Sequence, residues 1–270
     1  MLFAAFWKRN LGFYKLAVAT NLEYRLNFII DVLLQPAMTS GIEMLLWWAV
    51  FKGVGTATVG GFSEDYYLSY AVWAAFMSRV TSSWMYEFKM VEEIDSGTVN
   101  SLLVRPLSFY EYYFSQLMGY KTISTIFSFI FPVALVLFFH LPTQFDRLPL
   151  ALLLAFYYLI LIHSLSFLVS TMAFFFTKVS SITIAKNLFL WSLTGELLPL
   201  DLMPLWLQKI TLFLPFASGV FLPVGYITGR IEAPVLIDGF ISVTWSLILV
   251  NAVAIYFWKK GLKSYVGTGA

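Results

Sequence analysis

The sequence lacks cysteine and is poor in charge: none of its 270 residues is Cys, and only 12% are Asp, Glu, Lys or Arg. Without cysteine, the chain cannot form disulfide bonds, use a thiolate nucleophile or hold a metal through Cys ligands. It also lacks the phosphate-binding pattern Gly-x-x-x-x-Gly-Lys-Ser/Thr, because the nearest string, GYKT at 119–122, has no glycine in the required frame. An ATP-dependent function would therefore place ATP and its magnesium ion on another chain.

Apolar residues dominate the composition. Hydrophobic residues make up 60% and aromatic residues 19% of the chain, and the mean hydropathy is +0.79. These values exceed what a soluble domain of this length needs, and they indicate a membrane protein. The net charge of +2 is small and the basic residues are scattered, which argues against a nucleic-acid partner. No removable signal peptide is expected, because Lys8 and Arg9 follow the first apolar residues and no cleavage pattern comes after them.

Six apolar stretches reach the roughly 20 residues that a membrane-crossing helix needs. The predicted spans are at about 26–51, 66–88, 115–140, 148–176, 182–200 and 235–258. Pro36 interrupts the first of them. No internal repeat and no linker to a second domain is present. We therefore predict an all-α polytopic membrane protein with one transmembrane domain over residues 1–270.

Lys and Arg divide unevenly between the two sides that six spans would define. Twelve lie on the side of the N-terminus and four on the other side, while Arg79 lies inside a span. Because Lys and Arg concentrate in cytoplasmic segments, we expect both termini and the connection at 89–112 to be cytoplasmic.

Two further apolar segments are not predicted to cross the membrane. In residues 1–24, aromatic and aliphatic residues alternate with Lys8, Arg9 and Lys15, which favours an amphipathic helix along the inner headgroups. In residues 195–234, prolines recur too often for one straight helix. We expect two short helices there that enter the outer leaflet and return, since broken backbone at membrane depth must be buried in protein or line a cavity.

The connection between the second and third spans is polar and ordered: it includes EEIDSGTVNSLLVRPLSFYEYY. Gly97 and Pro106 bracket eight residues, enough for about two helical turns, whose spacing groups Val99, Leu102 and Leu103 on one face. Acidic residues precede this stretch, and Ser96 could cap it. Two interpretations stay open from these residues: a short helix with a docking partner, or a solvated loop whose acids keep it out of lipid.

The order of these features resembles the membrane subunit of type-two ABC exporters, in particular a branch of small bacterial permeases. The resemblance rests on the N-terminal amphipathic helix, the six spans, the acid, Ser-Gly, Leu-Leu and Arg-Pro-Leu of the polar connection, and GELLPLDLMPLWLQKITLFLPF before the last span. It implies a permease in a bacterial inner membrane that forms half of a pathway beside a second, identical or related permease. It also implies two copies of a separate ATPase, which binds ATP and Mg, and no cofactor in this chain.

In such permeases the second connection forms a coupling helix that docks on the ATPase. The resemblance thereby assigns ATPase coupling to Glu92, Glu93, Asp95, Ser96, Gly97, Val99, Leu102, Leu103, Arg105 and Pro106. Drugs, lipids and glycans are the cargoes of this superfamily, and the aromatic-rich composition fits an amphiphilic cargo without choosing one.

Ionisable residues within or beside the spans are the remaining candidates for the pathway. They are Asp31 and Glu43 in the first span, Arg79 in the second and Glu196 at the end of the fifth. A charge at membrane depth costs about 2.5 kcal/mol or more and usually faces a partner or water. Asp31 and Arg79 could form a structural ion pair or contact substrate, and Glu196 could pair locally or gate the exit.

His163 stands alone in the fourth span, without the neighbouring acids or His that a metal or nucleophilic site needs, so we expect a buried polar contact. Two other classes of function remain as alternatives. An ion-coupled secondary transporter would show broken helices in both halves, and only the second half has one. An intramembrane lipid enzyme would need more clustered polar residues than these spans contain.

Overall fold

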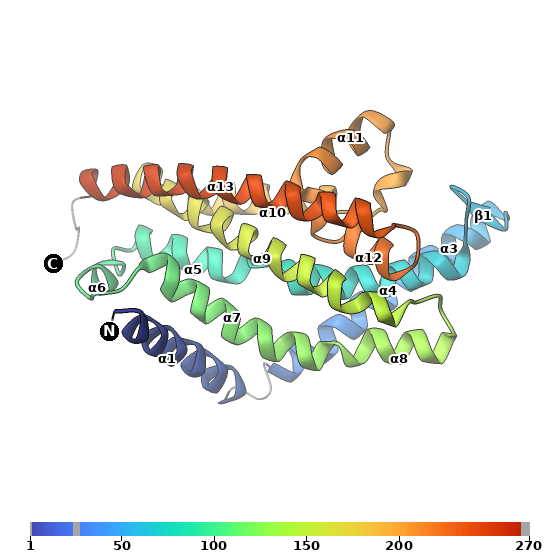
Figure 1. Ribbon diagram of the computed structural model, residues 1–270, viewed down its shortest axis with the longest axis horizontal. Coiled ribbons are helices and arrows are strands. Elements are labelled where there is room, and N and C mark those ends of the chain that lie inside the picture. The colour runs from blue at the N-terminus through green and yellow to red at the C-terminus, as the bar shows by residue number, and fades with distance from the viewer. Residues whose placement is uncertain (1, 24–27, 266–270) are drawn as a thin grey trace.

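The computed structural model describes residues 2–23 and 28–265 as an elongated bundle of helices with one small hairpin (Figure 1). Helices coincide with all six predicted stretches. Their bounds are η1 Ile30–Leu34 with α3 Gln35–Val54, α4 Glu64–Thr81 with α5 Trp84–Asp95, α7 Phe109–Ser128 with α8 Ile130–Phe139, α9 Leu148–Thr171, α10 Val179–Leu193 and α13 Ala233–Ser264. The hairpin pairs β1 Thr58–Val59 with β2 Phe62–Ser63 in antiparallel fashion.

Three of the described helical segments are long and apolar enough to cross a membrane, namely Phe109–Phe139, Phe145–Phe174 and Ala233–Ser264. The first joins α7 to α8, and the second extends α9 by the 3₁₀ turns η2 Phe145–Arg147 and η3 Met172–Phe174. The chain is therefore a helical membrane protein, and six spans stay a prediction. α10 has 15 residues, about 22 Å at 1.5 Å per residue, less than the roughly 30 Å of a hydrocarbon core.

Two of the predicted spans contain breaks with local causes. Before Pro36 the backbone forms a π turn, in which the Gln35 N–H donates to Ile30 O, because proline has no N–H for the usual bond and its ring crowds the preceding turn. Between α4 and α5, Ser82 is extended and ends the first helix. Neither break leaves the bundle, so both redirect a helix within it.

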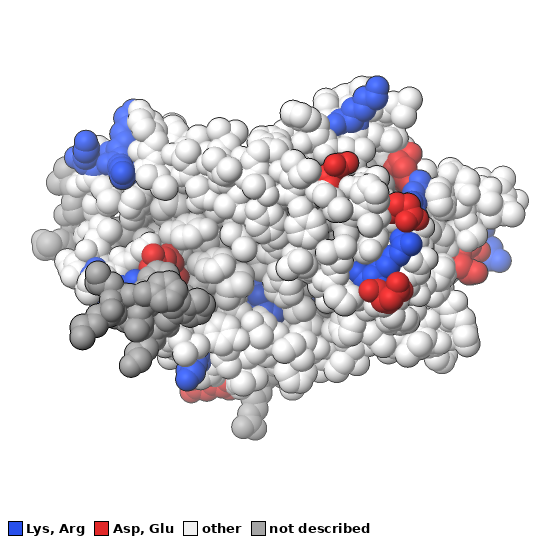
Figure 2. Space-filling model, in the orientation of Figure 1, with Lys and Arg blue, Asp and Glu red and all other residues white. Residues whose placement is uncertain are grey.

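α9 is the central helix and packs against α13, α5, α12 and α4. Its buried residues include Leu154, Tyr158 and Leu159, which join apolar cores in both halves of the bundle. α6, the start of α1 and the end of α13 lie at one end of the molecule, and the β hairpin lies at the other (Figure 1). On the face in Figure 2, Lys, Arg, Asp and Glu lie mostly near these two ends, and the band between them is largely uncharged.

The N-terminal helix α1 Leu2–Glu23 packs along α7. The crossing is close at Gly119, where an added Cβ would lie 2.7 Å from Ala17 Cβ and 2.8 Å from Tyr14 O. Arg9 ties the helix to the following connection through Glu111, at 2.9 Å, and through the carbonyl of Pro106, at 2.7 Å. One face of α1 is thus covered by protein, and its position along the headgroups stays a prediction.

The proline-rich segment 195–234 contains short helices, as expected: η4 Leu200–Leu202, α11 Leu205–Phe213, η5 Pro215–Ser218 and α12 Phe221–Ile227. The two α-helices have different surroundings. α12 is inside the bundle, with Val224 and Ile227 fully buried, whereas α11 exposes Leu205, Trp206 and Phe213. Figure 1 shows α11 projecting from the bundle. A position in the outer leaflet stays a prediction for both.

Candidate transport cavity and coupling segment

A cavity of about 460 Å³ lies between η1 and α3 on one side and α10 on the other. The α4–α5 junction and α7 also line it, and it reaches α9. α3 packs on α4, whereas α10 packs on α5 and α9, so the cavity separates α3 from α10. Its rim carries the exposed apolar side chains Trp84, Ile184, Leu188 and Trp191. The cavity therefore has an open, apolar side and a polar interior.

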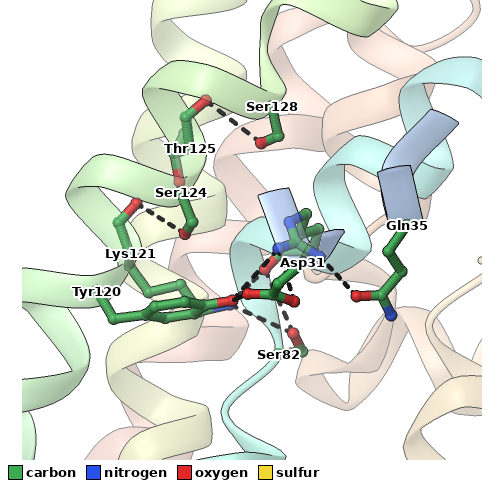
Figure 3. A network of polar contacts seen from close by, with 9 residues as sticks. Asp31, Gln35, Ser82, Tyr120, Lys121, Ser124, Thr125 and Ser128 are labelled. Carbon is green, nitrogen blue, oxygen red and sulfur yellow. Dashed lines mark hydrogen bonds and ion pairs between the residues drawn. The ribbon is translucent and has the colours of Figure 1, made fainter. Parts of the chain in front are cut away.

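The interior contains a network of polar contacts that includes Asp31, Gln35, Tyr120 and Lys121 (Figure 3). Arg79 Nη2 lies 3.0 Å from Asp31 Oδ1, and Nη1 donates to Gln35 Oε1 at 3.1 Å. Tyr120 OH accepts from Arg79 Nη2 at 3.3 Å and donates to Asp31 Oδ2. The predicted pairing of Asp31 with Arg79 is thus present, and the pair also lines the cavity. A role in transport stays a prediction.

Lys121 belongs to the same network and was not among the predicted site residues. Its Nζ donates to the carbonyl of Arg79 and to Ser82 Oγ, the second at 3.3 Å, and the residue is only 3% exposed. Lys121 thereby places a cation at the C-terminal end of α4, where the last carbonyls lack helical partners and the helix dipole favours positive charge.

Of the predicted acids Glu43 and Glu196, Glu196 lines the cavity and Glu43 does not. Ser78 on α4 donates to Glu196, which lines the cavity, and the two carboxylates are close enough for their charges to interact. Gly195 has a φ of 87°, which other residues rarely adopt, and Tyr70 OH donates to its carbonyl at 2.6 Å. The left-handed turn at Gly195 therefore directs Glu196 back toward α4.

A second polar network joins α5, α9 and α10. Lys186 forms an ion pair with Glu87, which is fully buried and also accepts from Ser166 Oγ at 2.7 Å. Ser166 Oγ lies 2.9 Å from Ser83 Oγ at the start of α5. Neither Glu87 nor Lys186 was a predicted site residue, because Lys186 was counted with the cytoplasmic charges. The sequence did contain a signal for Lys186, because this residue lies inside the predicted span 182–200.

The coupling segment differs from its prediction in length. Two helical turns were expected between Gly97 and Pro106, but α6 is the single turn Asn100–Leu103. Gly97 has a φ of 79°, and Pro106 disfavours helical backbone at Arg105, so both ends are restricted. Ser96 is the C-cap residue of α5, and its Oγ lies 2.9 Å from Thr98 Oγ1.

The apolar face of the coupling segment also needs correction. Val99 and Leu102 are buried against this chain's own helices, next to Ile94, Phe109 and Tyr113. Leu103 and Val104 are exposed, Val104 by 83%. Val99 and Leu102 are thus unavailable to a partner here, and the exposed apolar pair is Leu103 and Val104.

The charged residues of the coupling segment are mostly exposed. Glu92, Asp95 and Arg105 are exposed, and Glu93 is half-buried. Burial raises the pKa of the Glu93 carboxyl above its usual value, while a hydrogen bond from Tyr113 and the charge of Lys89 act in the opposite direction.

His163 is buried as expected. Its Nε2 lies 3.1 Å from the carbonyl oxygen of Tyr110, and its ring packs against Tyr110 and Phe114. Over residues 2–23 and 28–265, no group of three or more His, Asp or Glu could hold a metal ion.

The family of the chain follows from a comparison with family models. The model described as ABC-2 family transporter protein matches residues 37–269. The chain belongs to this family. As an ABC-2 membrane permease it is a transport subunit, and the match covers the coupling segment and most of the cavity lining, but not Asp31, Gln35 and Pro36. A comparison with curated proteins found no match.

Proposed function

We propose that this permease forms half of the translocation pathway of an ATP-driven exporter and couples to a separate ATPase, present in two copies, through residues 89–112. The observation that carries the proposal is the cavity with polar interior and open side. Arg79, Asp31, Lys121 and Glu196 face a space that α3 and α10 leave uncovered. A second permease, identical or related, would close that side, so that two such cavities form one pathway.

The ATPase contact is proposed at the end of the molecule that carries α6 (Figure 1). Leu103 and Val104 supply an exposed apolar pair there, and the exposed Glu92, Asp95 and Arg105 of the same segment carry charge that sets orientation. The excess of Lys and Arg predicted for this side favours the cytoplasm, which is where ATP is available. For a bacterial protein this places the permease in the inner membrane. The alternative of an ion-coupled secondary transporter has less support, because it would not require an exposed docking pair.

The experiment replaces Leu103 and Val104 together with Ser in the full chain and purifies the tagged permease from its native cells. We expect normal membrane insertion, since neither residue is buried. A phosphate-loop ATPase should co-purify with the wild type and be lost by ten-fold or more with the variant, because each buried apolar side chain contributes about 1.5–3 kcal/mol to a contact. Leu205→Ser, a change of an exposed leucine on α11, away from the coupling segment, is the control.

ATP-dependent transport by the reconstituted complex supplies the second measurement. Retention of the ATPase together with normal transport in the Leu103→Ser/Val104→Ser variant would refute this docking surface. If a proton or sodium gradient drove transport without any ATPase, the exporter proposal itself would be wrong.

A further inference from the structure

The interior of the cavity has an excess of positive charge around Arg79 and Lys121, which we call the cation pair. Both are largely removed from solvent, at 12% exposure for the Arg79 side chain and 3% for Lys121. One carboxylate, Asp31, forms an ion pair with Arg79. Lys121 has no ion-pair partner among residues 2–23 and 28–265, and its two hydrogen-bond acceptors are a carbonyl and a hydroxyl.

Hydrogen-bond donors also exceed acceptors at the cation pair. A lysine ammonium has three donors, and two acceptors surround Lys121. In the part of the chain that the structure describes, Arg79 Nε is buried without a hydrogen-bond partner. Buried polar groups are usually satisfied and buried charges usually paired, so the missing component is an anionic acceptor.

The acid that shares the cavity does not supply that acceptor. Glu196 accepts from Ser78, whereas Lys121 donates to Ser82, one helical turn further along α4. Ser78 and Ser82 are separated by about 6 Å along the helix axis. Glu196 and Lys121 therefore bind different atoms at this end of α4, and the acid forms no ion pair with either cation among the described residues.

The open side indicates what kind of anion reaches the cation pair. Trp84, Ile184, Leu188 and Trp191 form an exposed apolar rim, and such surface on a membrane protein faces either hydrocarbon or the apolar surface of a second permease. A molecule that enters over this rim needs long apolar groups as well as a charged end. A small hydrophilic anion would meet the apolar side chains first and would lose its hydration without compensation.

We propose that the cavity binds an anionic phospholipid, with its phosphate at Lys121 and Arg79 and its acyl chains along the rim on α10. A phosphate oxygen would accept a charge-assisted hydrogen bond from the remaining N–H of Lys121. Its negative charge would also offset the positive charge that Asp31 does not compensate. That the bound lipid is a substrate rests on the proposed export function. Binding of the lipid itself requires no ATPase. It specifies the head group of the amphiphile, an anionic phosphodiester.

The test titrates the purified permease in detergent with dioleoyl-phosphatidylglycerol and with zwitterionic dioleoyl-phosphatidylcholine, and measures bound lipid by native mass spectrometry. The wild type should prefer phosphatidylglycerol by about ten-fold or more, because both lipids carry the phosphate but the choline cation of phosphatidylcholine would add a third positive charge beside Arg79 and Lys121. Lys121→Met should bring the preference close to one, and Lys121→Arg should keep most of it. Lys260→Met removes an exposed cation at the end of α13 and should leave the preference unchanged.

Equal binding of the two lipids by the wild type would overturn the proposal. An equal loss in Lys121→Met and Lys260→Met would also overturn it, because general surface charge would then explain the preference. If Lys121→Met does not fold, quenching of wild-type tryptophan fluorescence by brominated phosphatidylglycerol, compared with brominated phosphatidylcholine, decides the question. Equal quenching by both lipids would reject the site.

The same measurements separate this proposal from the proposed function. ATP-dependent export by the complex without a preference for anionic lipid would reject the lipid site and leave the exporter intact. A preference that depends on Lys121 in a permease that associates with no ATPase would leave the site and reject the exporter.

Discussion

Two ion pairs in this bundle use the same chemistry in opposite surroundings. Glu87 and Lys186 join α5 to α10 and are closed off from solvent, with side-chain exposures of 0% and 11%. Asp31 and Arg79 join η1 to α4 and line the cavity, and Asp31 is 37% exposed. A closed pair mainly fixes the positions of its helices, whereas an open pair can exchange a partner for a ligand.

The closed pair also connects the helix that leads to the coupling segment with a wall of the cavity. α5 begins after the helix break at Ser82 and leads through Asp95 to the coupling segment, and its Glu87 holds α10, a wall of the cavity. In the proposed exporter, α5 would transmit a displacement of the coupling segment to α10 through this pair. The open pair lies on the opposite wall. The closed pair therefore supports the helices, whereas the open pair is available to bind a ligand.

The largest expected effect comes from breaking the closed pair. Lys186→Met leaves a fully buried carboxylate without its cation, and such a change costs about 3 kcal/mol or more, which for a chain of this length corresponds to roughly 6–12 °C in Tm. Thermal unfolding of the purified permease in detergent measures it, with Lys260→Met as the control.

The double variant Glu87→Met/Lys186→Met should recover most of the lost stability, because it leaves no uncompensated charge. A double variant that is as unstable as the sum of the two single variants would show that the side chains do not interact. The closed pair would then not stabilise the bundle through its ion pair, and it would not differ from the open pair in this respect.

The helices could be predicted from the sequence because length and hydropathy determine them. Six apolar stretches each contain a helix, and the pairing of Asp31 with Arg79 follows from their similar distance from the expected cytoplasmic ends of two predicted antiparallel helices. The break at Ser82 could not be predicted, because neither Gly nor Pro marks it. Beyond the break, α5 packs on α9, a tertiary contact that the local sequence does not encode.

The candidate site was predicted less completely than the fold. Periodicity grouped Val99 and Leu102 on an apolar face, but a pattern shows only that a face is apolar and not which surface covers it. The structure covers them with the chain's own residues. Lys121 and Lys186 were counted as cytoplasmic because they are near span ends, whereas their long side chains extend into the bundle.

A smaller effect is expected for the open pair. Asp31→Asn should lower Tm by about 2–4 °C, since a partly exposed ion pair contributes about 1 kcal/mol or less and Arg79 keeps its bonds to Gln35 and Tyr120. The same variant should bind phosphatidylglycerol more tightly, because the cation pair loses its one carboxylate. Native mass spectrometry measures this opposite change.

The two readouts of Asp31→Asn sharpen the comparison. Lower stability together with weaker binding of phosphatidylglycerol would show that Asp31 positions Arg79 for the lipid rather than competing with it. A loss of stability as large as that of Lys186→Met would show that the open pair is as structural as the closed one.

The smallest effect concerns Glu93 at the end of α5, a carboxylate that forms no ion pair with the residues that the structure describes. Because burial raises its pKa in the folded chain, the folded state holds the proton more tightly than the unfolded state, whose pKa is about 4.3. Stability is therefore lost as pH rises from the unfolded pKa through the folded pKa. Glu93→Gln stays neutral, so it should have a slightly higher Tm than the wild type at pH 7.5.

That gain should shrink toward zero as the pH is lowered to 4, where the wild-type carboxyl is protonated as well, and paired thermal unfolding at each pH measures it. Glu92→Gln, at the exposed neighbouring position, controls for the loss of one negative charge. A gain of the same size at pH 4 and pH 7.5 would mean that ionisation of Glu93 is not its cause. A gain that disappears with protonation would show that burial of the charged Glu93 carboxyl destabilises the end of α5 despite the nearby charge of Lys89.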